Sequence, residues 1–390
     1  MYDCHVVRAS ASFCARTGKP GSRAETRRRP YDMTIVHLVP RMDQGGVESV
    51  VVNLNNAVVA ASHHSVVISS GGRLAEKVTS AGGVHITLDV KSKNPLTYFS
   101  RALKLRRILK SLSKDSSPIL VCAHSRVPAW LFVWANRTLR LPWISYAHGA
   151  NSVSRYSAVM TKGDAVIAPS NFLAQFLLQN YKDETLPNRL SVISPGVDLK
   201  KYDSASIDLK SVQELKEAWG IDEHTFVTMS IGRISPVKGF DNVIKDFAAS
   251  TFPQRKNAKL VIVGGADKRH ANLLTELKSL ASSLGVSSSV VFAGQQSKIP
   301  ECLSIANEIV CGNTIKPESF GLSVCEALAM DKHVRLIREF GGAAEILESV
   351  KNFGALNPSD AVRNLYGIDV VATKTLEKYE EVLQRHKRCN

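Results

Sequence analysis

Short apolar runs alternate along the chain with longer segments in which apolar residues recur every three or four positions. Runs of the first kind are typical of strands buried on both faces of a parallel sheet, and the longer segments are typical of amphipathic helices. The predicted strands form two series. The first lies at 34–39, 65–69, 86–90, 118–122, 143–147, 165–169 and 189–193, and the second at 226–232, 259–265, 289–294, 308–312 and 333–337. The alternation predicts an α/β fold made of βαβ units.

A Pro-Gly step separates the two series. The stretch SPGVDLKKYD (194–203) interrupts the pattern and has the composition of a linker. We therefore predict two Rossmann-like doubly wound domains that face each other across a cleft, at 33–200 and 201–372, with a C-terminal helix at 373–390. Ligands of such domains bind at the carboxyl ends of the strands, so functional residues should follow strands directly.

Length and composition agree with this organisation. The chain has 390 residues, 44% of them apolar, which suits two domains better than one core. No apolar run reaches the roughly 18 residues that a membrane-spanning helix needs. The net charge of +15 favours anionic partners, which include nucleic acid, nucleotide phosphates and an anionic bilayer. Composition does not choose among these partners.

The cysteines and the first residues bear on the cellular compartment. Seven cysteines, without any C-x-x-C pair, predict reduced thiols in a cytoplasmic protein rather than a disulfide framework or a zinc site. Residues 1–32 are basic, poor in aromatic residues and without the apolar core of a signal peptide, which predicts a disordered N-terminal arm. A misassigned start upstream of Met33 and an organelle transit peptide are the alternatives.

Two segments that follow predicted strands have the composition of phosphate sites. In PRMDQGGVE, Gly45 and Gly46 permit close approach of the backbone, and the start of the next helix supplies free N–H groups. In SIGRISPVKG, Arg233 and Lys238 flank a Ser-Pro turn and can converge on one diphosphate. Neither segment is a G-x-G-x-x-G or Walker A loop, which disfavours nicotinamide cofactors and ATPase chemistry. A plain turn and solvated surface charges are the alternatives.

Two carboxylates and a histidine follow other predicted strands. PESFGLSVCE has Glu318 in a loop and Glu326 in the early turns of the next helix. Carboxylates suit sugars because each accepts hydrogen bonds from two neighbouring hydroxyls, although stabilisation of the helix dipole would also account for Glu326. His148 ends a strand in WISYAHGAN, beside the strand end that carries HSRVP (124–128), and can donate to a sugar hydroxyl or a developing charge. A structural role is the alternative for His148.

The segment 96–114 predicts a basic amphipathic helix. Its apolar stripe consists of Ala102, Leu105, Leu109 and Leu112. Its basic residues, most of them off that stripe, are Arg101, Lys104, Arg106, Arg107, Lys110 and Lys114. Such a helix can lie on an anionic membrane surface. The alternative is an ordinary outer helix with a solvated face.

Together these motifs resemble the retaining GT-B glycosyltransferases of family 4 over about residues 34–350. GGVE, GRISPVKGFD and PESFGLSVCEALAM carry the resemblance, and the last has the family's Glu-x7-Glu spacing. HSRVPAW and SAGG resemble members that build lipopolysaccharide or other surface glycans. The chain departs from the family after EALAM, where Asp331, Lys332 and His333 stand in place of the usual Gly and Pro, and the strand that follows is unusually charged.

The resemblance implies a role for each candidate residue. Arg233 and Lys238 would hold the donor's diphosphate, and Gly45 and Gly46 would approach its phosphates from the other domain. The residues implied to hold the donor's ribose and sugar are Glu326 for the ribose, Glu318 for the sugar hydroxyls, the backbone at Phe320, Gly321 and Leu322, and His148 near the sugar. The resemblance also implies a final helix that crosses back toward the N-terminal domain.

The predicted activity is transfer of a sugar from a nucleotide diphosphate sugar to a hydroxyl of a glycan or glycolipid, such as lipopolysaccharide, with retention of anomeric configuration. No cofactor or metal is expected, since no acidic motif such as D-x-D occurs. The expected location is cytoplasmic, peripheral on the cytoplasmic face of the inner membrane. The rival hypotheses are a nucleotide-sugar epimerase of the same fold and a non-catalytic binding protein. No nucleic-acid motif supports a nucleic-acid partner.

Overall fold

The computed structural model describes residues 33–389, except for residues 44, 114–116, 256 and 267–269. The predicted N-terminal arm, residues 1–32, lies outside the described residues, and so does the last lysine of the predicted basic helix, Lys114.

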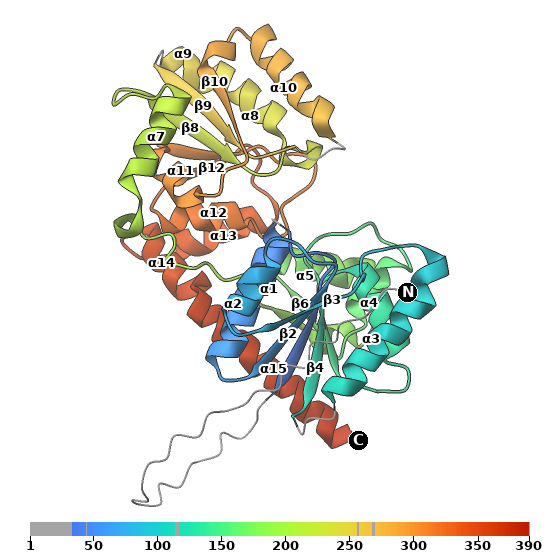
Figure 1. The fold of residues 1–390 in the computed structure, drawn as a ribbon. Helices are drawn as coiled ribbons and strands as arrows, with labels where there is room; N and C mark the ends of the chain where they lie inside the picture. The colour runs from blue at the N-terminus through green and yellow to red at the C-terminus, as the bar shows by residue number, and fades with distance from the viewer. Residues whose placement is uncertain (1–32, 44, 114–116, 256, 267–269, 390) are drawn as a thin grey trace, which may run out of the picture. The chain divides into compact units, whose positions relative to one another are not determined.

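The N-terminal domain contains a seven-stranded parallel sheet of order β3-β2-β1-β4-β5-β6-β7. Its strands are β1 (Thr34–Leu38), β2 (His64–Ser69), β3 (Val84–Thr87), β4 (Ile119–Ala123), β5 (Trp143–Tyr146), β6 (Ala165–Ala168) and β7 (Leu190–Val192). The helices between them are α1 (Gly46–Ala60), α2 (Ala75–Ser80), α3 (Tyr98–Leu112), α4 (Arg126–Ala135), α5 (Asn171–Asn180) and α6 (Leu186–Arg189). The strand order reverses between β1 and β4, which is where a doubly wound sheet opens a crevice for ligands. Figure 1 shows the sheet between α1 and α2 on one side and α3 and α4 on the other.

The C-terminal domain repeats this plan with a five-stranded parallel sheet of order β10-β9-β8-β11-β12. Its strands are β8 (Phe226–Ile231), β9 (Ala258–Val263), β10 (Val290–Gly294), β11 (Glu308–Cys311) and β12 (His333–Leu336). Its helices are α7 (Leu209–Trp219), α8 (Phe240–Asp246), α9 (Phe252–Gln254), α10 (Ala271–Ser283), α11 (Ile299–Ile305), α12 (Leu322–Ala329), α13 (Gly341–Phe353) and α14 (Pro358–Tyr366). The order reverses between β8 and β11, so the predicted fold class of two doubly wound domains is confirmed.

Side chains of alternate residues along β1 pack on opposite faces of the sheet, because successive residues of a strand point in opposite directions. Ile35 packs with Leu54 of α1 in one core cluster. Val36 packs with Leu105 of α3 and Phe132 of α4 in another. The sheet is therefore covered by helices on both faces, which explains why its strands appear in the sequence as continuous apolar runs.

One predicted strand is displaced in the structure, and the charge of another is explained by an ion pair. The strand predicted at 86–90 lies at Val84–Thr87, because Asp89 instead forms a turn in which its carboxylate accepts hydrogen bonds from the backbone of Lys91 and Ser92. The unusually charged strand is β12, which lies at the edge of its sheet. There Arg335 donates two hydrogen bonds to Asp246, of 3.0 and 2.7 Å, so its charge is neutralised outside the core.

Asp331 stands where the family resemblance leads one to expect glycine, and it adopts the left-handed conformation that glycine favours, with φ +53°. Its carboxylate accepts hydrogen bonds from the backbone N–H and the hydroxyl of Ser359, at the start of α14. These bonds offset part of the backbone strain, since an aspartate tolerates this conformation better than most residues do.

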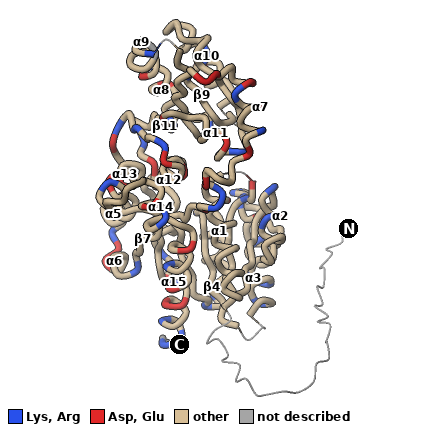
Figure 2. Tube along the Cα trace, turned by 90° about the vertical axis from the view of Figure 1, so that its left-hand side faces the viewer, with Lys and Arg blue, Asp and Glu red and all other residues tan. Residues whose placement is uncertain are grey.

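The last helix, α15 (Ile368–Cys389), begins before residue 373, the predicted boundary, and packs against the N-terminal sheet. Tyr379 is fully buried there, and its hydroxyl forms a 2.7 Å hydrogen bond with the hydroxyl of Tyr146. The exposed side of α15 carries acidic residues in its middle and basic residues near its C-terminal end (Figure 2). Among the described residues, no helix combines the length and the apolar character needed to span a bilayer.

The substitution Tyr379→Ala should lower the free energy of unfolding by about 3–5 kcal/mol, because it removes a large buried ring and leaves a cavity. The substitution Tyr379→Phe removes only the hydroxyl, and it should cost about 1–3 kcal/mol because the buried Tyr146 hydroxyl loses its partner. Urea unfolding measures both values, with Glu377→Ala on the exposed side of α15 as the control. A loss for Tyr379→Ala no larger than that of the control would contradict the docking of α15.

Candidate functional site

Two loops of the C-terminal domain meet where its strand order reverses. They are residues 232–239 after β8 and residues 312–321 after β11. A Cβ atom added to Gly239 would lie 2.0 Å from the carbonyl oxygen of Gly312, and a Cβ added to Gly312 would lie 2.1 Å from that of Gly239. The two backbones therefore touch at a distance that only glycine permits.

The contact between these loops joins two of the predicted site residues. The ammonium group of Lys238 donates a hydrogen bond to the carboxylate of Glu318 in an ion pair. Both side chains stay about one-quarter exposed, so a ligand can reach them. They line a small hollow together with Ser230, Ile231, Phe240, Cys311, Gly312, Asn313, Ser323 and Val324. A cation and an anion in one hollow suit a ligand with both phosphate and hydroxyl groups.

Glu326 lies on α12, close to this hollow. The hydroxyl of Tyr202 donates a hydrogen bond to its carboxylate. Burial raises the pKa of Glu326, while the Tyr202 hydrogen bond and the positive charges of Lys201 and Lys238 act in the opposite direction. Sequence reasoning did not single out Tyr202 or Lys201. The signal that could have found them is an adjacent lysine and tyrosine at the end of the linker motif, next to the C-terminal domain.

The loop from Glu318 to Leu322 is held in place by its backbone. The N–H of Gly342 donates a 2.8 Å hydrogen bond to the carbonyl of Glu318, and a Cβ at Gly342 would lie 2.6 Å from the Cα of Phe320. Gly321 has φ +101°, and Leu322 then begins α12. The predicted sugar-binding backbone is thus a fixed turn, and its packing requires the small residue Gly342 beneath it.

Gly45 and Gly46 lie at the start of α1, as predicted. The carboxylate of Glu48 folds back over Gly45, since a Cβ there would lie 2.4 Å from one of its oxygens. Burial raises the pKa of Glu48, and the positive charge of Arg233 offsets part of this rise. Arg233 therefore acts electrostatically on the first turn of α1, whereas Lys238, on the same loop, pairs with Glu318.

His148 follows β5 and adjoins the loop that carries Glu318. A Cβ at the next residue, Gly149, would lie 3.6 Å from the hydroxyl of Ser319. The hydroxyl of Ser170 donates a 2.5 Å hydrogen bond to the carbonyl of Ser319. His148 and the loop predicted to bind the sugar are thus brought together, although Glu318 follows His148 by 170 positions in the numbering.

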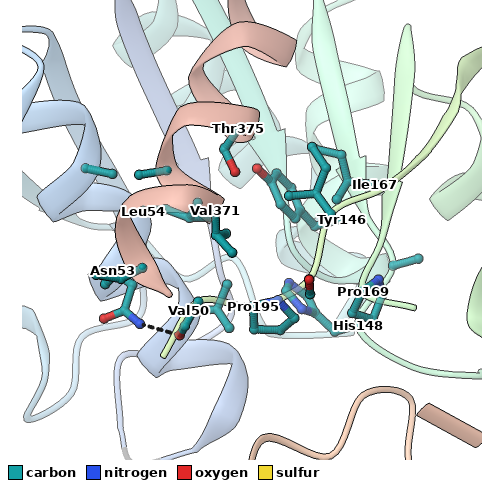
Figure 3. Close-up of a pocket in the computed structure, with 17 residues that line it drawn as sticks. Val50, Asn53, Leu54, Tyr146, His148, Ile167, Pro169, Pro195, Val371 and Thr375 are labelled. Atoms are coloured by element: carbon teal, nitrogen blue, oxygen red, sulfur yellow. Dashed lines mark hydrogen bonds between the residues drawn. The ribbon is translucent and has the colours of Figure 1, made fainter. Parts of the chain in front are cut away.

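His148 also lines a largely apolar pocket, shown in Figure 3. Its walls come from α1, the ends of β5 and β6, the linker and α15. Asn53 of α1 donates a 3.3 Å hydrogen bond to the carbonyl of Gly196 in the linker. The pocket lies where the linker and the last helix meet, and it is too apolar to hold a diphosphate.

Helix α3 forms a separate candidate surface. Phe99, Leu103, Arg106, Arg107 and Lys110 recur at three- and four-residue spacing, and most are exposed. Phe99 packs edge-on against the half-exposed ring of Trp134 in α4, with 4.6 Å between ring centres.

Arg101 differs from the other basic residues of α3, because it is buried and so lies off the exposed face. Its guanidinium donates hydrogen bonds to four backbone carbonyls, those of Asp89, Ser92, Asn94 and Thr97. It fixes the loop before α3 and is unavailable to a partner.

Among the residues that the structure describes, no group of three or more histidine, cysteine, aspartate or glutamate side chains could hold a metal ion. The side chains of Cys122, Cys302, Cys311 and Cys325 form no disulfide.

Two family models match this chain. Residues 44–201 match the model described as Glycosyltransferase Family 4, and residues 211–364 match Glycosyl transferases group 1. The chain belongs to the family 4 glycosyltransferases. The two matches correspond to the two doubly wound domains, so this family 4 chain has the GT-B fold.

Individual relatives agree with this assignment. D-inositol 3-phosphate glycosyltransferase of Salinispora arenicola is 32% identical over 179 residues, which cover 44% of this chain and 39% of that protein. The chain therefore spans about two fifths of that relative's length. A glycosyltransferase structure from Rickettsia africae has 26% identity and a TM-score of 0.76, and the match covers 90% of this chain and 99% of that one. HepE of Anabaena, in complex with UDP and glucose, has 17% identity, a TM-score of 0.74 and coverage of 90% and 100%.

The substitution Gly239→Ala should destabilise the protein more than Gly285→Ala. Both glycines have left-handed φ, +62° and +73°, which costs alanine about 1–2 kcal/mol. Only at Gly239 would the new Cβ meet the Gly312 carbonyl, and nothing lies within 4 Å of a Cβ at Gly285. Overpacking should add roughly 1–3 kcal/mol. Equal losses in urea unfolding would show that the two loops do not require this contact.

Proposed function

We propose that the protein transfers a sugar from a nucleotide diphosphate sugar to an acceptor hydroxyl and retains the anomeric configuration. The observation that carries the proposal is the hollow at the β8–β11 reversal, where Lys238 and Glu318 meet with Glu326 close by. In a nucleotide diphosphate sugar, the pyrophosphate lies between the ribose and the transferred sugar. A cation suits the pyrophosphate and a carboxylate suits each of the two sugars, and the three side chains supply these groups.

Lys238 and Arg233 hold the diphosphate in this proposal. Lys238 would exchange its pairing with Glu318 for a phosphate oxygen, and this frees the carboxylate for the sugar. Arg233 acts on the start of α1, where Gly45, Gly46 and the helix N-terminus favour a second phosphate. The negative charge that develops on the leaving diphosphate is stabilised by these groups, and such stabilisation is usually the largest catalytic effect.

The carboxylates hold the two sugars of the donor. Glu318 accepts hydrogen bonds from hydroxyls of the transferred sugar, and the fixed turn at Phe320, Gly321 and Leu322 presents backbone groups to it. Glu326 accepts from the ribose, and its hydrogen bond from Tyr202 orients the carboxylate for that role. A buried carboxylate without a hydrogen-bond partner costs free energy, so the partners of Glu326 matter more because it is buried.

Retention follows if the acceptor attacks the face from which the diphosphate leaves. The bond from the anomeric carbon to the phosphate oxygen breaks, and a bond to the acceptor oxygen forms on the same face. The acceptor proton passes to the departing phosphate oxygen, so charge and atoms balance. A nucleophilic carboxylate is unnecessary in this route, and Glu318 remains a sugar ligand. Neither cofactor nor metal is required, and His148 assists near the sugar.

The comparisons bear on the substrates. HepE of Anabaena is in complex with UDP and glucose, and the Salinispora arenicola relative is named for inositol 3-phosphate. Within the proposal, the HepE complex favours a UDP-sugar as donor. The proposed acceptor, a hydroxyl of a glycan or glycolipid such as lipopolysaccharide, rests instead on the resemblance of HSRVPAW and SAGG to members that build surface glycans. An epimerase of the same fold would interconvert donor sugars without any acceptor, so incubation with donor alone separates the two activities.

The substitution Lys238→Ala should lower kcat/KM by roughly 10²–10³, because it removes one stabilising group from the leaving diphosphate. Release of nucleoside diphosphate from a panel of nucleotide sugars, with and without a glycolipid extract, measures the effect. The control is Lys210→Ala, whose side chain is exposed on α7. Full activity in both Lys238→Ala and Glu326→Ala would refute the site assignment.

We also propose that α3 binds an anionic membrane surface from the cytoplasmic side. The exposed rings and aliphatic side chains of Phe99, Leu103 and Trp134 can enter the interface, while Arg107 and Lys110 on the same side can meet lipid phosphates. Lys and Arg along α3 are visible in Figure 2. An acceptor carried by a lipid would then be presented to the enzyme at the membrane.

The triple substitution Arg106→Gln, Arg107→Gln and Lys110→Gln should weaken binding to phosphatidylserine vesicles about a hundredfold, since each basic residue near the surface contributes about 1 kcal/mol. Vesicle co-sedimentation at fixed salt measures it. A matched control removes three exposed lysines elsewhere: Lys200, Lys210 and Lys374. Equal binding by the two triple variants would attribute any attraction to net charge alone and end this proposal for α3.

A further inference from the structure

Three histidines form a line across the ends of three neighbouring strands. His37 lies on β1, and His124 and His148 follow β4 and β5. Nδ1 of His37 lies 3.0 Å from Nε2 of His124, and Nδ1 of His124 lies 2.9 Å from Nε2 of His148. His37 and His124 are buried and His148 is partly exposed, so the line runs from the core of the sheet to the candidate site.

The two short contacts restrict where protons can be. A neutral histidine carries one N–H, on either Nδ1 or Nε2, and each nitrogen–nitrogen contact needs one proton between its two atoms. If all three rings are neutral, only two arrangements satisfy both contacts. In one, every ring has its proton on Nδ1, and in the other, every ring has it on Nε2. The three tautomers are therefore coupled.

The rings are neutral at physiological pH, because the line is withdrawn from water. Burial lowers the pKa of His37 to about 3 and that of His148 to about 4. Burial lowers the pKa of His124 as well, and the neighbouring rings of His148 and His37 act in the same direction. A positive charge on any ring would lie against another ring, and the rings of His124 and His148 are stacked with centres 5.2 Å apart.

The inner end of the line selects between the two arrangements. Nε2 of His37 is buried and has no hydrogen-bond partner among the described residues. With protons on every Nε2, this atom would be a buried N–H without an acceptor. With protons on every Nδ1, it would be an unused lone pair. Buried N–H groups without partners are the rarer of the two defects in folded proteins, which favours protons on Nδ1 throughout.

We propose that His37 and His124 are positioning residues that hold His148 in its Nδ1–H tautomer, so that its outer nitrogen is a hydrogen-bond donor to the bound sugar. This inference deepens the proposed function and rests on it for the identity of the ligand. His148 then stabilises an oxygen of the donor sugar and cannot act as the base, because its outer nitrogen already carries a proton. The acceptor proton must leave by another route, which agrees with transfer to the phosphate oxygen.

Histidine nitrogen chemical shifts of the full chain, labelled with ¹⁵N in histidine only, test the tautomer directly. We expect a protonated Nδ1 and an unprotonated Nε2 for His148, assigned by the loss of its signals in His148→Gln. Protonation of His148 at Nε2 would overturn the inference. The measurement needs no substrate, so it is independent of the proposed function.

A pair of variants of nearly equal size tests the role in catalysis. In His37→Asn, the amide can still donate to Nε2 of His124, and kcat should stay within a few-fold of the natural value. In His37→Asp, an ionised carboxylate can only accept, so it should reverse the line and lower kcat roughly 10²–10³-fold with little change in KM. Natural kcat in His37→Asp with a reversed His148 tautomer would overturn the inference.

If His37→Asp fails to fold, the substitution His124→Phe supplies a second test. The ring of Tyr146 stacks on that of His124, with centres 4.6 Å apart, and does not share its protons. His124→Phe therefore keeps the stack and removes the coupling, and it should lower kcat without changing KM. An unchanged kcat would overturn the inference.

An enzyme that never transfers sugar but shows the Nδ1–H tautomer would refute the proposed function and this role for His148 together. Transfer with the opposite tautomer would refute the inference alone.

Discussion

Contact between two backbones, at Gly239 and Gly312, is the constraint on which the candidate site depends. β8 and β11 are neighbours in the sheet, and the loops that leave them must turn in the same small space. Because neither glycine has a Cβ, the carbonyl of each can occupy the position where the other's side chain would lie. The bond from Asn313 to the carbonyl of Val237, 2.7 Å long, holds this arrangement from the side. Lys238 and Glu318 meet because the loops that carry them lie in contact.

Opposite charges then organise the hollow that this contact creates. Lys238 balances Glu318, and Tyr202 and Lys201 stabilise the more deeply placed Glu326. Tyr202 belongs to the segment that leaves the N-terminal domain, and its ring packs in the C-terminal core. Val197 in that segment pairs with Gly367, just before α15. The two chain crossings between the domains therefore run side by side, and one of them contributes a hydrogen bond to the site.

The N-terminal domain contributes polar groups of a different kind. Its sheet carries three coupled imidazole rings at the ends of β1, β4 and β5, beside the reversal of strand order where doubly wound sheets bind ligands. Burial keeps these rings neutral, and their spacing makes each one determine the hydrogen-bonding character of the next. In the proposed site, His37 and His124 would fix the tautomer of His148 from inside the sheet, without contacting the sugar themselves.

The sequence by itself determined the two parallel sheets, because apolar runs without alternation occur where both faces of a strand are buried. It also determined the candidate chemistry, since glycines, cations and acids directly after strands must lie at the carboxyl edge of a sheet. Tertiary structure alone decided the partners. Lys238 and Glu318 are 80 residues apart in sequence, and periodicity reports which face of an element is buried but not which loop meets it. For the same reason only the structure revealed the role of Tyr202 beside Glu326, the burial of Arg101 by carbonyl groups, and the contact of His37 with His124 across two strands.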